Sequence, residues 1–210
     1  GSAVFGTNSS VAGATSFSAG DNNIINSSVT GSMAFGRYAT VSHDYSAVFG
    51  LDSSAASRCY SSSPNTMKVC GVVQADAIQT SGGDFAEEFS ASQPLSAGTV
   101  VVMGDDGYKS VKPCDKDYDQ SVVGVVSDTV GLLMGKIDSE IKVTVGLVGV
   151  VKIKVSNING PIRKGDLLVT SRLAGMAMKD IANRPGTIIG KALEDFNAPS
   201  GEIMALINLQ

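Results

Sequence analysis

A short phrase returns four times in the first fifty residues of this chain. Each copy begins with serine and ends with glycine, and the copies are Ser2-Ala-Val-Phe-Gly6, Ser16-Phe-Ser-Ala-Gly20, Ser32-Met-Ala-Phe-Gly36 and Ser46-Ala-Val-Phe-Gly50. The closing glycines are spaced by 14, 16 and 14 residues. One unit has too few apolar side chains to offset the entropy of ordering its own backbone, so units must stack and share a core. The repeat therefore predicts an extended stack of short coils, as in a fibre or spacer.

A second phrase fills the gaps, as Asn8-Ser-Ser-Val-Ala-Gly13, Asn26-Ser-Ser-Val-Thr-Gly31 and Asp52-Ser-Ser-Ala-Ala-Ser57. Small and apolar residues in short runs that end at Gly, Asn or Asp predict short strands and tight turns over residues 1–57. The 16-residue spacing predicts a loop excursion at residues 21–23. Four aromatic residues at recurrent places are expected to form the buried ladder of a β-solenoid or β-roll, namely Phe5, Phe17, Phe35 and Phe49. A disordered Ser/Gly linker, the alternative, has no reason to keep such spacing.

The remainder of the chain has a different texture. Residues 58–83 contain a Ser-Pro-Asn turn cluster and are expected to form a linker with a connecting strand at residues 72–79. Residues 84–210 contain Val- and Ile-rich runs separated by Gly, Pro, Asn and Asp, which predict an all-β barrel or sandwich of short strands. Single helical turns are expected at residues 85–89 and 179–183.

Charge and cysteine content exclude several classes of protein. A formal net charge of -4 with no Lys/Arg run argues against a nucleic-acid partner. No apolar run has the length of a membrane span, and we expect no signal peptide in this sequence. The chain opens within a repeat, so we expect a fragment. Its three cysteines, Cys59, Cys70 and Cys114, are an odd number without CxxC spacing. They are expected to be free, partly buried thiols, and the alternative is that Cys59 pairs with Cys70 within or between chains.

The repeat phrases resemble the heads of trimeric autotransporter adhesins over residues 1–57. In that family, units of similar length coil into a β-roll and three chains pack together, and similar repeats occur in phage tail fibres. The resemblance implies an intertwined homotrimer.

The second half resembles the C-terminal domain of phage tail-spike and appendage proteins of the intramolecular-chaperone, or peptidase G2, type. The resemblance covers residues 72–210 and rests on segments in order, among them Gly82-Gly-Asp-Phe-Ala-Glu-Glu-Phe89, Gly160-Pro-Ile-Arg-Lys-Gly-Asp-Leu-Leu-Val-Thr-Ser171 and Gly186-Thr-Ile-Ile-Gly-Lys-Ala-Leu-Glu194. It implies a trimeric assembly module at the end of a fibre. Some members of that family cut themselves, and the cut maps here onto the Gly83–Asp84 bond, with Asp84 and Glu87 as catalytic residues.

The acidic pair has two interpretations. Two carboxylates three residues apart on a turn can face each other, which raises the pKa of one and provides a proton donor beside a general base. Family members place Ser before the Asp, whereas this chain has Gly83, so water or a carboxylate would have to attack. The alternative is structural, with Asp84 capping a helical turn and Glu87 completing a capping box.

Other patterns fail as sites, and we expect neither a metal nor a cofactor. The segment 115–119 begins like a calcium loop, but Gln120 and Val126 occupy the positions that require Gly and Glu. Two glycine-rich segments, 131–137 and 186–192, lack the spacing and hydroxyl of a phosphate-binding loop. The single histidine, His43, is expected to be an exposed turn residue, or alternatively a ring stacked along a trimer axis.

These observations predict a structural fibre protein of a virion, with a C-terminal trimerisation and chaperone-like module of a tail fibre or tailspike and a role in host attachment. One alternative is an autoproteolytic domain. Another is a bacterial surface adhesin or a glycan-binding tip, for which the candidate aromatic residues are Tyr38, Tyr45, Tyr60, Tyr108 and Tyr118.

Overall fold

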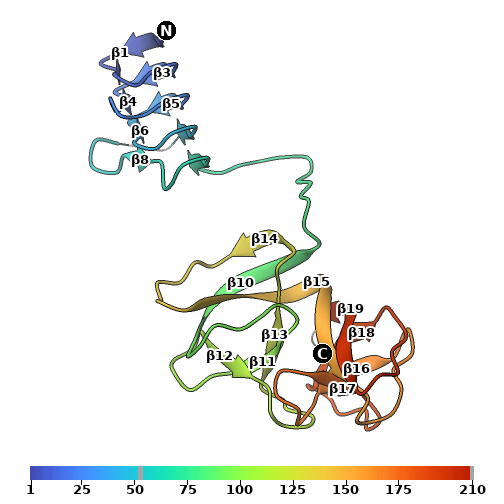
Figure 1. Ribbon diagram of the computed structural model, residues 1–210. Helices are drawn as coiled ribbons and strands as arrows, with labels where there is room; N and C mark the ends of the chain where they lie inside the picture. Colours follow the sequence, from blue (N-terminus) through green and yellow to red (C-terminus); the bar gives the residue numbers. More distant parts are fainter. Residues whose placement is uncertain (52–53, 209–210) are drawn as a thin grey trace. The chain divides into compact units, whose positions relative to one another are not determined.

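The computed structural model describes residues 1–51 and 54–208, and within them every regular element is a β-strand. The chain divides into two compact units, Gly1–Ile78 and Gln79–Gln210 (Figure 1). The expected all-β fold, with stacked coils followed by a sheet domain, is confirmed. The helical turn expected at residues 85–89 is wrong, because these residues lie in a strand, and residues 179–183 form a strand end and a bend.

The first unit is a β-solenoid in which each coil adds one strand to each of two parallel sheets. The first sheet contains β1 (Ala3–Thr7), β3 (Phe17–Asp21), β5 (Met33–Arg37), β7 (Ala47–Gly50) and β9 (Met67–Cys70). The second contains β2 (Ser10–Val11), β4 (Ile24–Ile25), β6 (Ala39–Val41) and β8 (Cys59–Tyr60). Neighbouring strands pair in register, so equivalent residues of the repeat lie next to each other, as Gly20 lies beside Gly36. The core between the sheets contains Ile25, Val29, Ala34, Ala39, Val41, Val48 and Cys59.

The closing glycines allow the coils to approach closely. Gly6, Gly20 and Gly36 have φ values of 117°, 134° and 87°. A Cβ atom on any of them would collide with the carbonyl oxygen of the closing glycine in the next coil. The recurrence of glycine is therefore a requirement of the stack, both for backbone conformation and for space.

The phenylalanines do not form the core, contrary to the sequence prediction. In β3 and β5 the inward side chains are Ser18 and Ala34, both fully buried, whereas the phenylalanine rings lie on the outer face. The rings still form a continuous ladder, with centroid separations of 5.7, 5.5 and 5.1 Å along Phe5, Phe17, Phe35 and Phe49. Phe5 is largely exposed and the other three are half-buried. The outer face of this sheet is thus apolar.

The extra two residues of the second coil lie at its other corner, so the expected excursion at residues 21–23 is wrong. Asn22 is a left-handed corner residue equivalent to Asn8 and Tyr38. The added length lies at residues 26–29, where Val29 donates a backbone hydrogen bond to Asn26. Val29 is buried, so the longer coil supplies an additional core side chain.

The stacked coils continue beyond residue 57, where the sequence predicted their end. Strand β8 pairs with β6 and β9 pairs with β7, which adds one further coil that ends at Cys70. The repeat copy at residues 52–57 begins at positions outside the described residues. A disulfide joins Cys59 and Cys70, with Cα atoms 5.8 Å apart, so the expectation of free thiols is wrong for these two. Cys114 is free and buried. The connecting strand expected at residues 72–79 is absent, and this segment is exposed and has no regular secondary structure.

The second unit contains one ten-stranded sheet. Its strands are β10 (Asp84–Ala91), β11 (Val100–Met103), β12 (Ser110–Pro113), β13 (Val122–Val126), β14 (Val130–Met134), β15 (Lys142–Ser156), β16 (Leu167–Thr170), β17 (Ala177–Lys179), β18 (Ile188–Ala192) and β19 (Ser200–Asn208). The pairing order is β14-β10-β12-β11-β13-β15-β17-β16-β18-β19, and further pairings join β10 to β15 and β15 to β19. These two pairings close two rings of strands that share β15, which corresponds to the barrel alternative of the sequence prediction.

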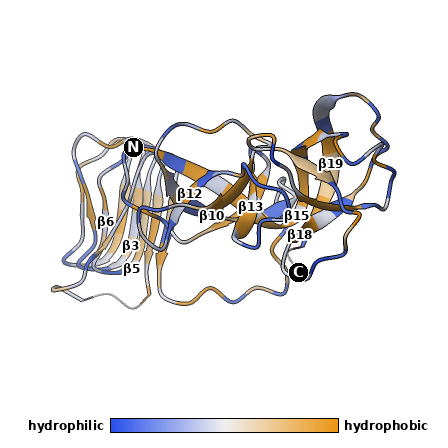
Figure 2. Cartoon of the chain, turned by 90° about the horizontal axis from the view of Figure 1, so that it is seen from below, coloured by the Kyte–Doolittle hydropathy of each residue, from blue (hydrophilic) through white to orange (hydrophobic). Residues whose placement is uncertain are grey.

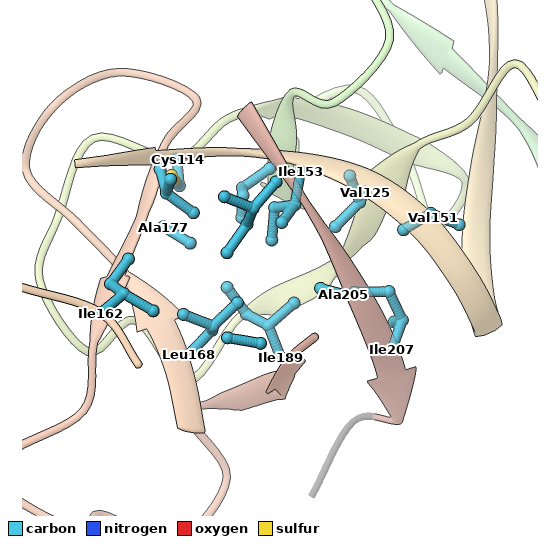
Figure 3. Packing of buried hydrophobic residues seen from close by; sticks show 14 of the residues in the cluster. Cys114, Val125, Val151, Ile153, Ile162, Leu168, Ala177, Ile189, Ala205 and Ile207 are labelled. Atoms are coloured by element: carbon cyan, nitrogen blue, oxygen red, sulfur yellow. The ribbon is translucent and has the colours of Figure 1, made fainter. Parts of the chain in front are cut away.

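Aliphatic side chains fill this unit. The largest cluster joins residues of both rings, including Cys114, Val125, Val151, Ile153, Leu168 and Ile207 (Figure 3). The orange colouring in Figure 2 shows the apolar character of β13. A second cluster contains Phe89, Val101, Val111, Val126, Val143 and Val145. The candidate site lies where the first residue of β10 meets the middle of β15.

Candidate functional site

The candidate site is the start of β10, where the exposed segment 72–79 gives way to the sheet. Asp84 is the first residue of the strand and is 2% exposed. It lies opposite Val130 of β14 and Gly149 of β15, so strands on both sides enclose it. The Gly83–Asp84 bond is therefore at the boundary between exposed chain and packed sheet.

The Asp84 carboxylate has one satisfied and one unsatisfied oxygen. Its Oδ1 accepts hydrogen bonds from Ser127 Oγ at 3.1 Å and from Thr129 Oγ1 at 3.4 Å. Its Oδ2 is buried and has no hydrogen-bond partner among the described residues. A Cβ atom on Gly146 would lie 3.0 Å from Oδ2, so the absence of a side chain there makes room for the carboxylate.

Burial raises the pKa of Asp84, and the hydrogen bonds from Ser127 and Thr129 oppose that effect without cancelling it. The cause is desolvation, since the charged form loses water and gains only neutral hydroxyl donors. A buried acid with a raised pKa beside a peptide bond is a candidate proton donor.

The preceding peptide group is held by both neighbouring strands. Gly83 donates a backbone hydrogen bond to the Thr129 carbonyl at 3.0 Å, and its own carbonyl accepts one from Val150 at 3.4 Å. Gly149 has a φ of 128°, and a side chain there would collide with the Gly83 carbonyl. The bond is thus fixed in place, with its carbonyl polarised by an amide donor.

Asp84 and Glu87 are not brought together, so the expected acidic pair on a turn is wrong. Both lie on one extended strand, where residues three apart point to opposite faces. Glu87 instead pairs with Lys109 at 3.6 Å, and the raised pKa of Asp84 comes mainly from burial. The capping box is also wrong, because no helical turn follows Asp84.

Sequence reasoning missed Ser127 and Thr129. They lie 43 and 45 residues from Asp84 and come directly after strand β13. Two hydroxyl residues that follow an apolar strand were the available signal, but nothing in the sequence connects them with Asp84. Ser81, the nearest hydroxyl residue before Gly83, is exposed.

The remaining sequence candidates have structural partners. Asp117 accepts hydrogen bonds from Arg172, and Asp119 accepts them from Ser121, so two carboxylates of the acidic turn are engaged by protein donors. Among the described residues, no group of three metal-ligating side chains occurs. The two glycine-rich segments contribute to β14 and β18.

His43 is half-buried, so the expectation of an exposed residue is wrong. Its Nδ1 lies 2.8 Å from Ser61 Oγ. Of the five tyrosines, Tyr108 is the most exposed. The guanidinium group of Arg184 lies over the Tyr118 ring, 4.7 Å from its centroid. Among the described residues, no helix has the length and apolar character that a membrane crossing requires.

Comparison with known proteins gives structural similarity alone. No protein-family model and no curated protein matches the chain. It is similar to the pre-mature bacteriophage phi29 gene product 12, with 18% identity and a TM-score of 0.47, over all of this chain and 34% of that one. A C-terminal fragment of the same product gives 15% identity and a TM-score of 0.44, over 60% of this chain and all of the fragment. The head fiber gp8.5 N base of bacteriophage phi29 gives 16% identity and a TM-score of 0.37, over 59% of this chain and 92% of that one. This chain thus spans about a third of the length of the first structure.

Proposed function

We propose that this chain is a structural fibre protein of a phage virion appendage that associates as a homotrimer. The observation that carries the proposal is the solenoid with its outward phenylalanine ladder. Coils that stack through parallel strands form an elongated element, and an apolar ladder on the outer face of a coil requires a covering partner. The repeats resemble the heads of trimeric adhesins, and this resemblance supports an assembly of three chains.

The second unit is proposed to be the trimerisation and chaperone-like module of a tail fibre or tailspike. The order of its sequence segments, which resembles the intramolecular-chaperone type, supports this role. Its two rings of strands, which share β15, are proposed to set the register of three chains. Attachment to a host glycan or protein is the expected task of such an appendage, and a bacterial surface adhesin is the alternative setting.

The molar mass in solution tests the fibre proposal. Light scattering after size-exclusion chromatography at micromolar concentration is expected to give three times the mass of one chain. A mass equal to one chain across the accessible concentration range contradicts the proposal.

Self-cleavage at the Gly83–Asp84 bond is a second candidate, favoured by the buried and partly unsatisfied Asp84 carboxyl group. Hydrolysis would add one water, leaving a carboxylate on Gly83 and an amine on Asp84. Asp84 in its protonated form is the candidate proton donor, and Ser127 positions it. Glu87, which pairs with Lys109, is proposed to act only if a rearrangement frees it.

Intact-mass spectrometry after prolonged incubation tests this second candidate. A fragment that begins at Asp84 is expected from the unaltered chain and is expected to be lost in Asp84→Asn. Glu87→Ala separates the roles of the two carboxylates. If the unaltered chain keeps its full mass, self-cleavage is rejected while the fibre proposal stands.

A further inference from the structure

One face of the second unit exposes apolar side chains from four adjacent strands. We call this the exposed sheet face, and it consists of Phe85, Leu132, Val148, Val150 and Leu206, which are between 38% and 52% exposed. A single exposed leucine on a protein surface is ordinary, but a contiguous group from several strands indicates a binding surface.

The strand register makes this group contiguous. Phe85 lies opposite Leu132 of β14 on one side and opposite Val148 of β15 on the other. Val150, two residues further along β15, lies opposite Leu206 of β19. Directly opposed residues point to the same side of a sheet, and so do residues two apart on one strand. Their immediate chain neighbours point inward and are buried, namely Ala86, Val151 and Ala205.

The exposed sheet face has an uncharged centre and a charged margin. Lys191 lies opposite Leu206, and an ion pair joins Lys152 to Glu202 at 3.8 Å on the neighbouring positions of β15 and β19. An apolar centre with a polar rim is the usual anatomy of a protein interface. The five residues of this centre offer no cationic side chain to an anionic glycan or a nucleic acid.

A shallow pocket borders the face and could receive a side chain from a partner. It has a volume of about 130 Å³, and Leu167, Ile188 and Leu206 contribute apolar lining. Leu206 belongs both to the face and to the pocket. The surface is therefore not uniformly flat, and the pocket has room for an apolar side chain from a partner bound to the face.

We propose that the exposed sheet face binds a second copy of this chain, an inference that rests on the proposed fibre function. The five residues expose on the order of 400 Å² of surface, about half of the roughly 800 Å² that each partner contributes to a stable interface. The margin and the pocket supply adjoining area. A second copy fits because the centre carries no charge, so copies can approach without burying like charges.

This interface would also border the candidate cleavage bond. The Gly83 carbonyl accepts its hydrogen bond from Val150, a member of the face. A second copy seated on Val150 would therefore limit the access of water to the Gly83–Asp84 bond.

The test is the association of the full chain with Val148→Glu and Leu206→Glu combined. Burying two carboxylates is expected to raise the dissociation constant, measured by analytical ultracentrifugation, at least tenfold. The matched control is Met103→Glu, because Met103 is 62% exposed and lies on β11, which contributes no residue to the face. Circular dichroism and thermal unfolding verify that each variant is folded. The milder Val148→Thr with Leu206→Gln replaces the first pair if that pair fails to fold.

Hydrogen exchange of the unaltered chain gives an independent measurement. Peptides from β10 and from the middle of β15 are expected to gain protection as the protein concentration rises through the dissociation constant. An oligomer that keeps its affinity in both face variants overturns this interface and leaves the fibre proposal intact. A chain that is monomeric throughout overturns both proposals.

Discussion

The side chain of Ser32 accepts a hydrogen bond from the backbone amide of Ser46, 14 residues later, at 3.0 Å. The same bond joins Ser16 to Ser2 at 3.1 Å and Ser32 to Ser16 at 3.2 Å. The hydroxyls of Ser16, Ser32 and Ser46 each also donate a hydrogen bond to the backbone carbonyl two residues before them. The first residue of the repeated phrase thus forms a polar spine that links the coils, and it explains why serine recurs there.

Ser32→Ala is expected to lower the free energy of unfolding of the solenoid by about 1–3 kcal/mol, because the buried Ser46 amide loses its acceptor. Hydrogen exchange measured on peptides of the first unit separates this effect from the second unit. Ser28→Ala, at an exposed position of the same unit, is the control and is expected to change little. Equal effects of the two substitutions would show that the spine does not stabilise the stack.

Gly20→Ala is expected to destabilise the solenoid by about 3 kcal/mol or more, because the new Cβ atom would collide with the Gly36 carbonyl. Gly107→Ala is the matched control. Gly107 also has a positive φ, of 91°, but no atom lies within 4 Å of its added Cβ, so about 1 kcal/mol of backbone strain is expected. Denaturant unfolding followed by hydrogen exchange compares them. A similar cost for both would mean that conformation, and not close approach, selects glycine.

The Cys59–Cys70 disulfide is expected to leave one thiol in the unreduced chain. Alkylation of the unreduced chain in denaturant should modify Cys114 alone. After reduction, the same treatment should modify all three cysteines. In the folded chain Cys114 should react slowly, since burial raises its pKa to about 11. Cys59→Ser with Cys70→Ser is expected to cost about 2–3 kcal/mol, because the closed loop no longer restricts the unfolded state. Three reactive thiols without reduction would contradict the pairing.

Asp84 is expected to make the second unit less stable as pH rises. Because its pKa in the folded state is above the ordinary value of 3.8, the folded state holds the proton more tightly than the unfolded state. The resulting stabilisation is present below about pH 3.8 and is lost as pH rises through the folded pKa. Asp84→Asn should remove this dependence, whereas Asp76→Asn, in the exposed segment, should keep it. Parallel pH profiles of unfolding for all three chains would refute the assignment.

The stacked-coil architecture could be predicted from the sequence because one unit cannot bury a core alone. A repeated phrase with recurrent Gly and Ser brings equivalent residues together, so period and register follow from the same pattern. The runs of Val and Ile in the second unit likewise predict strands, since β-branched residues fit a pleated, half-buried surface. The face of the sheet on which the phenylalanines lie could not be predicted from the sequence. Phe17 stands two places earlier in its phrase than Phe5, and Ser18 and Ala34 occupy the inward positions.

The candidate site depended on contacts between distant parts of the chain. Asp84 was identifiable from its motif, but its partners Ser127 and Thr129 reach it only because β10, β14 and β15 lie side by side. Because residues 84–91 form a strand, the side chains of Asp84 and Glu87 point to opposite faces. Local patterning is therefore sufficient for the repeat, where neighbours in space are one period apart. Only the tertiary structure determines which residues surround Asp84, because long-range strand pairing has no period that a single sequence displays.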